Sequence, residues 1–343
     1  MPHERWSSSL GARRHRRVYT RGMLSLRVIV PHEAAAALLH TLVDLPFVVE
    51  LSHQPNGAHK PAGDVLHCVV PREAASELVE VVRQRAPGAL IAISDMLSLE
   101  APNAEAAADD APGVGADAVI WEAVDANVAR NTEISATFVL FMCIAGAIAG
   151  IGLLTDSVVL IIGAMVLGPE FGVLAAFCIA SVRKQWNVAL RAALLLLLGF
   201  GAAIVATYVT VRGCIALGIA PVNWNASRHP ATLFVSNPDA YAVLVGCLAG
   251  IAGMVSQTTG QYGALIGVFI SVTTIPAAAN VAVALAYGHT HEGIGATEQL
   301  LVNIAAIVVA GIVTVFLQRW RFSQRLGALL AHLPAPRRRS GRR

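Results

Sequence analysis

From residue 134 onward, long apolar runs alternate with short polar links. Crossing a bilayer takes about 20 apolar residues in a helix, and six runs come close to or exceed that length. These runs are Ile134–Leu154, Ser157–Val182, Val188–Val211, Tyr241–Gln257, Tyr262–Tyr287 and Leu300–Leu317. The pattern predicts an α-helical polytopic membrane domain of six transmembrane helices over residues 134–318.

Ahead of this region, residues 23–100 carry shorter runs with a different period. Four of them alternate or cluster like strands, and two begin with proline and have helical spacing. The expected strands are Leu24–Val30, Phe47–Leu51, Asp64–Val70 and Leu90–Leu99, with helices at Pro31–Val43 and Pro71–Arg85 and a turn at Pro55–Gly57. The order βαββαβ predicts a ferredoxin-like α/β domain, which by itself defines no ligand.

Four polar or basic segments complete the expected organisation. Residues 1–22 are Arg-rich and are interpreted as a disordered tail, or as sequence upstream of a start at Met23. Residues 101–118 are rich in Ala, Asp, Pro and Gly and read as a linker. Residues 119–133 form a juxtamembrane helix that lies on the interface or docks on the bundle, and residues 319–343 form a basic tail.

Composition supports a membrane protein and excludes several other classes. Of 343 residues, 55% are hydrophobic and 14% are charged, against roughly 25% charged in soluble domains. The net charge of +3 is small, so nucleic acid is not an expected partner. The sequence has no Walker, GxSxG or HExxH motif, and we expect neither an enzyme nor a cofactor. The five cysteines read as packing residues, and His289-Thr-His291-Glu292 is not expected to bind metal.

Charges in the links predict how the chain crosses the membrane. Lys and Arg gather after the second span, at Arg183, Lys184 and Arg191, and again beyond residue 318. In the link after the first span, the only charged residue is Asp156. Because cytoplasmic loops are enriched in Lys and Arg, both termini are expected on the cytoplasmic side.

Short matches recur at one spacing across the membrane region. Cys143, Gly163 and Thr210 lie in motifs that return 104 residues later around Cys247, Gly267 and Thr314. On this spacing Glu170 corresponds to Thr274. Three spans per copy is an odd number, so the second copy would cross in the opposite sense. The spacing therefore predicts two inverted three-helix repeats, an arrangement found in many secondary transporters.

The second span is interrupted at its centre by Gly168-Pro169-Glu170. Proline breaks helices, and a charge in the bilayer costs about 2.5–3.5 kcal/mol on insertion scales. The fifth span also has polar and helix-breaking residues at mid-depth. We predict a site for a small solute or ion between these two broken helices. Its candidate residues are Gly163, Gly168, Pro169, Glu170, Thr273, Thr274, Pro276 and Asn280.

Each of these features also has a simpler interpretation. Pro169 and Pro276 could be packing kinks, which transmembrane helices tolerate. Glu170 could be structural, either protonated, hydrogen-bonded or facing solvent in a re-entrant turn; the functional alternative is a proton or cation site. Burial without a cation would favour the neutral acid. For Asn280 and Asn303 the default role is an interhelical hydrogen bond.

Two motifs give the chain a family resemblance. Ile162-Gly-Ala-Met-Val-Leu-Gly-Pro169 and Gly267-Val-Phe-Ile-Ser-Val-Thr-Thr-Ile-Pro276 resemble the uncharacterised hydrophobic domain family, domain of unknown function 389, of prokaryotic membrane proteins. The resemblance covers roughly residues 134–318, and the α/β part also looks like that of family members. It implies a multi-pass protein of the prokaryotic cytoplasmic membrane and no particular substrate. Many relatives have Pro-Leu-Met-Gly-Pro where this chain has Pro169-Glu-Phe-Gly-Val173, so Glu170 departs from the commoner pattern.

Two functional hypotheses follow from the sequence. The first is a secondary-transporter-like or permease-like protein whose partners are the bilayer and an unknown small solute or ion, with protons among the candidates. The second is a membrane-anchored sensor or scaffold whose soluble α/β domain binds a ligand or partner. Homo-oligomerisation is compatible with either hypothesis.

Overall fold

The computed structural model describes residues 22–96, 98–99, 101, 103–111, 118–221, 224, 240–271 and 273–332. The chain forms two compact units, one of residues 1–120 with 325–343 and one of residues 121–324. The predicted N-terminal tail up to residue 21, the linker centre at 112–117 and the C-terminal tail from residue 333 lie outside the described residues.

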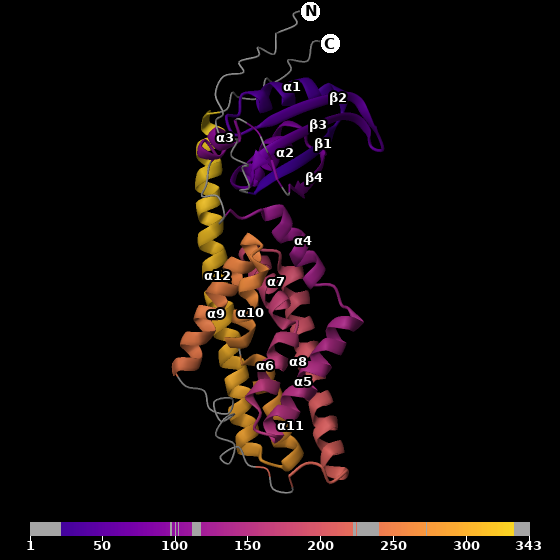
Figure 1. Ribbon diagram of the computed structural model, residues 1–343, viewed down its shortest axis with the longest axis vertical. Helices are drawn as coiled ribbons and strands as arrows, with labels where there is room; N and C mark the ends of the chain where they lie inside the picture. The colour runs from indigo at the N-terminus through magenta and orange to yellow at the C-terminus, as the bar shows by residue number, and fades with distance from the viewer. Residues whose placement is uncertain are drawn as a thin grey trace, which may run out of the picture. The chain divides into compact units, whose positions relative to one another are not determined.

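The first unit contains a four-stranded antiparallel sheet (Figure 1). Its elements are β1 (Met23–Val30), α1 (His32–Val43), β2 (Glu50–His59), β3 (Ala62–Pro71), the 3₁₀ turn η1 (Arg72–Ala74), α2 (Ala75–Arg85), β4 (Leu90–Asp95) and α3 (Ala104–Asp109). The strand order is β2-β3-β1-β4, so the two strands that are central in space are first and third in sequence. The chain therefore follows the predicted element order and adds α3.

One local prediction in this unit is wrong. The segment Pro55–Gly57 was expected to be a turn, but β2 continues through it to His59. The register against β3 shifts between Gln54 and Ala58, so the extra residues form an irregular bulge rather than the end of the strand. Asn56 takes the positive φ that the bulge requires.

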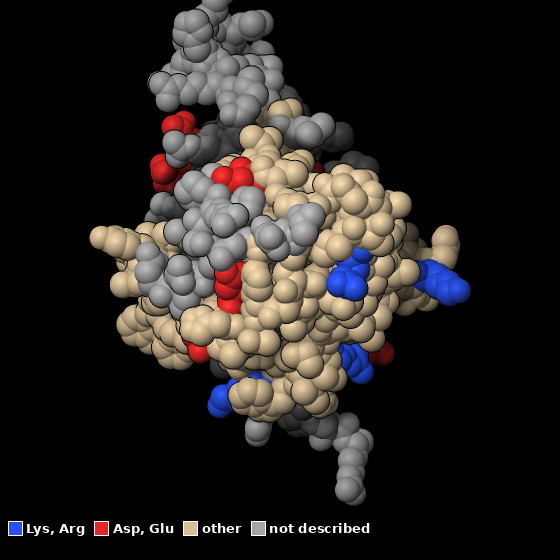
Figure 2. Space-filling view, turned by 90° about the horizontal axis from the view of Figure 1, so that it is seen from below, with Lys and Arg blue, Asp and Glu red and all other residues tan. Residues whose placement is uncertain are grey.

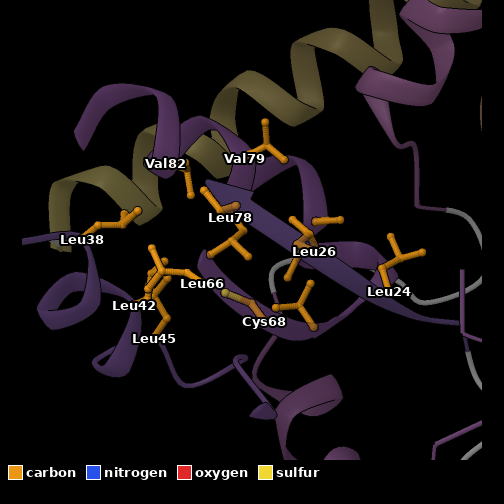
Figure 3. Close-up of a cluster of buried hydrophobic side chains, with 14 of the residues drawn as sticks. Leu24, Leu26, Leu38, Leu42, Leu45, Leu66, Cys68, Leu78, Val79 and Val82 are labelled. Carbon is orange, nitrogen blue, oxygen red and sulfur yellow. The ribbon is translucent and has the colours of Figure 1, made fainter. Parts of the chain in front are cut away.

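One face of β1 builds the core of the first unit. Every second residue, from Leu24 through Leu26 and Val28 to Val30, is buried against the layer that α1 and α2 form on one face of the sheet. Leu38 of α1 and Leu78 of α2 are fully buried in the same cluster (Figure 3). Complete burial of such side chains contributes roughly 1.5–3 kcal/mol each, which makes this cluster the main source of stability in the unit.

The second unit consists of helices. They are α4 (Trp121–Asn131), α5 (Ala136–Leu154), α6 (Val158–Leu167), α7 (Glu170–Val182), α8 (Trp186–Ala216), α9 (Ala240–Thr259), α10 (Tyr262–Ser271), α11 (Thr274–Tyr287) and α12 (Thr290–His332), of which residues 325–332 are counted with the first unit. Four described helices, α5, α8, α9 and α12, are long and apolar enough to cross a membrane, and α6 with α7 makes a fifth if the bent pair is one span. The expected fifth span instead divides into the shorter helices α10 and α11. The six-span arrangement therefore stays a prediction.

The bend of 48° between α6 and α7 follows from the local sequence. The N–H of Gly168 makes the last hydrogen bond of α6, to the carbonyl of Ala164 at 3.1 Å. The next residue, Pro169, has no N–H to continue the ladder. The helix restarts at Glu170, so the break falls where the sequence placed it.

Helix starts recur at one spacing along the second unit. The helices α5, α6, α7 and α8 begin at Ala136, Val158, Glu170 and Trp186, and α9, α10, α11 and α12 begin 104 residues later at Ala240, Tyr262, Thr274 and Thr290. The turns recur as well: Asp156 and Gly260 share a positive φ, as do Lys184 and Gly288. The local backbone of one half thus repeats in the other, including at positions where the side chains differ.

Packing contacts repeat at the same spacing. A Cβ atom on Gly146 of α5 would lie 2.8 Å from the carbonyl oxygen of Ala203 in α8. In the second half, a Cβ atom on Gly250 of α9 would lie 2.7 Å from the carbonyl oxygen of Ile307 in α12. Both helix pairs therefore approach through a glycine that admits no side chain, the small-residue mode of close packing expected in membranes.

The outer surface of the second unit is predominantly apolar. Large side chains such as Leu197 (75% exposed) and Val205 (62% exposed) point outward from α8. In the view of Figure 2, uncharged side chains cover most of the described surface and charged ones are scattered. Such a surface suits lipid rather than water.

Candidate functional site

The two helix restarts bring Glu170 and Thr274 into contact. Glu170 opens α7 and is 5% exposed, and Thr274 opens α11 and is fully buried. The Thr274 hydroxyl donates a hydrogen bond of 2.9 Å to Glu170 Oε1. These residues stand 104 positions apart, so first residues of corresponding helices meet each other inside the unit.

The second oxygen of the carboxylate is less well satisfied. Glu170 Oε2 is buried and has no hydrogen-bond partner among the described residues. It lies against Gly168, where a Cβ atom would collide with it and would come within 2.9 Å of Ile275 Cγ1. The absence of a side chain at residue 168 is therefore what gives the carboxylate its place.

The break also gives the carboxylate a favourable electrostatic setting. The first turn of a helix has N–H groups without intrahelical partners, and this end of the helix favours negative charge. Glu170 belongs to the first turn of α7 and bonds to the first residue of α11. One carboxylate thus lies at the N-terminal ends of two helices that are distant in sequence.

A second polar contact joins α11 to α12 beside the first. Asn303 Nδ2 donates to the hydroxyl of Thr273 at 2.6 Å, and Thr273 directly precedes Thr274. Gln299 lies one turn before Asn303 on α12 and is 1% exposed. Its Oε1 is buried and has no hydrogen-bond partner among the described residues. Polar groups therefore continue from the break into α12.

The remaining predicted residues divide between the site and its surroundings. Pro276 occupies the first turn of α11, where a missing N–H costs little, and it is buried. Asn280 is fully buried further along α11. Gly163 does not join this group: it is exposed on α6, and a Cβ atom there would meet nothing within 4 Å. Its expected place in the site is not observed.

Sequence reasoning missed Gln299 because the sixth span was drawn from Leu300. In the structure α12 already begins at Thr290, so Gln299 lies well within the helix. The spacing of four residues to Asn303 places both amides on one face, which is the signal that a longer helix would have revealed.

The juxtamembrane helix docks on the bundle beside the break, which was one of its two expected positions. Asp125 of α4 forms an ion pair with Arg183, the residue that directly follows α7, and this guanidinium also lies 6.0 Å from the Trp121 ring centroid. At the other end of α4, Asn131 fills the space above Gly172 in the first turn of α7. α4 therefore lies along α7 over most of its length.

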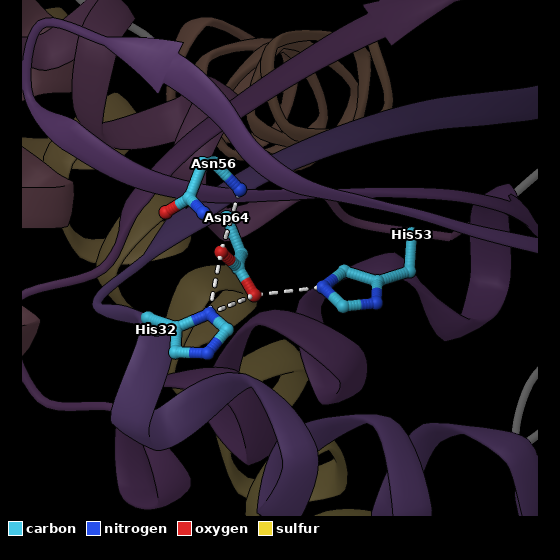
Figure 4. A network of polar contacts seen from close by, with 4 residues as sticks. All are labelled: His32, His53, Asn56 and Asp64. Atoms are coloured by element: carbon cyan, nitrogen blue, oxygen red, sulfur yellow. Dashed lines mark hydrogen bonds and ion pairs between the residues drawn. The ribbon is translucent and has the colours of Figure 1, made fainter.

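The first unit has its own buried carboxylate, Asp64 at the start of β3 (Figure 4). It accepts hydrogen bonds from the backbone N–H of Asn56 at 2.8 Å, from His32 Nδ1 at 3.0 Å and from His53 Nε2 at 2.8 Å. These bonds, the one from Asn56 first, hold the pKa of Asp64 well below its usual range. The network ties the bulge of β2 and the start of α1 to β3.

Asp64→Asn is expected to loosen this unit in a pH-dependent manner. Because the folded state lowers the Asp64 pKa, its stabilisation is present above the unfolded pKa of about 3.9 and is lost as pH falls below it. Hydrogen exchange of β3, compared between variant and wild type, should show faster exchange in the variant at pH 7. The difference should shrink in strong acid; an equal difference at both pH values would contradict the assignment.

The apolar helices and the broken pair define a helical membrane protein of unknown activity. A family model described as Domain of unknown function (DUF389) matches residues 165–309, which contain both restarts and Asn303. The match confirms the resemblance found in the sequence: residues 165–309 of this chain are similar to the DUF389 family.

A curated relative is likewise without an assigned activity. An uncharacterized protein of Methanocaldococcus jannaschii is 22% identical over 188 residues. This match covers 54% of the present chain and 56% of the relative, so the chain spans about half of that protein's length. No solved structure matches the chain significantly.

Proposed function

We propose that this protein is a secondary-transporter-like membrane protein that binds a small solute or ion where α7 and α11 begin. The observation that carries the proposal is the buried contact between Glu170 and Thr274. A helix broken around a buried carboxylate is costly in a membrane, and intramembrane carboxylates commonly mark ion or substrate paths.

The constant spacing of helix starts supports a duplicated architecture. We take each half to comprise three spans. The first half consists of α5, the pair α6 and α7, and α8; the second half consists of α9, the pair α10 and α11, and α12. An odd number of spans gives the halves opposite orientations, with an axis in the membrane plane. Glu170 and Thr274, which correspond to each other and touch, would lie near that axis.

The other parts have supporting roles in this proposal. Both termini are cytoplasmic, and the protein is not an enzyme. The element order and strand order of the first unit support a ferredoxin-like domain, which would regulate the bundle or hold copies of it together. The carboxylate supplies the charge that selects the solute.

Flux into proteoliposomes tests the transport proposal. Currents on a solid-supported membrane after jumps in sodium, potassium, ammonium, chloride or acetate should exceed those of protein-free liposomes for at least one of these ions. Glu170→Gln removes the charge and keeps the shape, so the flux should fall on the order of tenfold or more.

Glu298→Gln is the matched control for this experiment. It makes the same chemical change at an exposed carboxylate of α12, and its flux should equal that of the wild type. Equal flux in the Glu170→Gln variant would remove the carboxylate from the mechanism. The absence of flux for every solute in a wider panel would contradict transport itself.

A further inference from the structure

Near the helix restarts, the unsatisfied groups of the bundle share one chemical character. Glu170 Oε2 and Gln299 Oε1 are both buried oxygens without a hydrogen-bond partner among the described residues. An amide oxygen and an ionised carboxylate oxygen only accept hydrogen bonds. With Glu170 ionised, what these atoms lack is a donor, and a bound cation would favour the ionised form of this buried carboxylate.

The two oxygens belong to one connected group of side chains. Glu170 bonds to Thr274, and the neighbouring Thr273 bonds to Asn303, one turn from Gln299. In the first bond the Thr274 hydroxyl uses its one hydrogen, and in the second the Asn303 amide uses one of its two hydrogens. Rotation of the Thr274 hydroxyl or of the Asn303 amide away from its present acceptor would break a contact that joins two helices.

The charge of the region disfavours an anion. Among the described residues of α5 to α12, the buried polar and charged side chains are Glu, Gln, Asn, Ser and Thr, and none is Lys, Arg or His. The N-terminal ends of α7 and α11 do favour negative charge, but Glu170 already supplies it there. A second anion would meet this carboxylate with no basic side chain to compensate.

A calcium ion is also a poor match for this arrangement. Hard cations such as calcium take six to eight oxygen ligands at once. The group offers two free buried oxygens. An ammonium group, by contrast, forms directional hydrogen bonds and carries several donors, so two acceptors and one negative charge serve it well.

We infer that the solute of this site is a small monovalent cation that donates hydrogen bonds, of the ammonium or alkylamine class. The inference rests on the proposed function and names its substrate class. The cation would bond to Glu170 Oε2 and Gln299 Oε1.

Binding to the purified full-length protein in detergent tests the inference without any need for transport. Thermal unfolding would be followed in methylammonium chloride, tetramethylammonium chloride and sodium chloride at equal concentrations. Methylammonium has donors, whereas tetramethylammonium has the same charge and none. We expect methylammonium alone to raise the unfolding temperature in a saturable manner.

Variants then locate the effect. Glu170→Gln and Gln299→Leu should each weaken the apparent affinity for methylammonium, the first by about tenfold or more because a charge-assisted bond is lost. Glu298→Gln should bind as the wild type does. Stabilisation by methylammonium that is unchanged in Glu170→Gln would place the amine elsewhere and overturn the inference.

The wild type alone also suffices to reject the inference. Equal stabilisation by tetramethylammonium or sodium would show that charge and not donated hydrogen bonds is recognised. No stabilisation by any of the three salts would mean that bound water satisfies the two oxygens. In either case flux of another solute could still support transport, so the two proposals fail separately.

Discussion

Gly250→Leu is expected to prevent the second half of the helical unit from packing. A side chain at this position would be directed into the backbone of α12 at Ile307, which has no rotamer by which to move away. Overpacking usually costs about 1–3 kcal/mol, and collision with backbone lies at or beyond the upper end. Gly146→Leu meets Ala203 in the same way and should have a similar effect.

Size-exclusion chromatography of heated samples in detergent would measure the folded fraction. Gly201→Leu and Gly213→Leu are the controls, because both glycines are exposed on α8 and a Cβ atom there meets nothing within 4 Å. We expect the folded fraction to fall by similar amounts in the Gly146→Leu and Gly250→Leu variants and to change little in the two controls. If only one of the Gly146→Leu and Gly250→Leu variants lost its folded fraction, the two halves would not pack equivalently.

Single cysteines placed in corresponding turns are expected to label from opposite sides of the membrane. With both termini cytoplasmic, Thr155 and Thr290 would face outward, whereas Gln185 and Gln261 would face the cytoplasm. All four residues are exposed, so a cysteine at each would be accessible to a reagent. The five native cysteines would first be replaced.

A membrane-impermeant maleimide applied to intact cells and then to inverted vesicles makes the measurement. Thr155→Cys and Thr290→Cys should react in cells, and Gln185→Cys and Gln261→Cys only in vesicles. All four should react after detergent permeabilisation. Labelling of Thr155→Cys and Gln261→Cys from the same side would be incompatible with inverted halves.

Local rules were sufficient to predict the helix break. Pro169 lacks an N–H, and the restart at Glu170 follows from that alone. The spacing of 104 likewise relates Glu170 to Thr274 from the sequence alone. Their hydrogen bond could not be predicted, because it depends on how the two halves face each other and not on either helix by itself.

The orientation of a helix around its own axis is harder to predict from sequence than the position of a helix break. α6 is apolar on all sides, so its sequence does not indicate which face turns inward, and Gly163 was placed in the site although it is exposed. Hydropathy also predicts too late a start for the last span, at Leu300 instead of Thr290. Thr290 and the polar residues after it lower the local hydropathy but do not prevent helix formation, and this concealed Gln299.

The pairing of Glu170 with Thr274 makes the two halves chemically unequal at the place where they meet. In a bundle whose halves exchange roles during transport, identical halves would give inward-open and outward-open forms the same free energy. Here α7 contributes a carboxylate at this place, and α11 contributes a hydroxyl. Having Glu170 in one half and Thr274 in the other would therefore also determine whether the inward-open or the outward-open form of the bundle has the lower free energy.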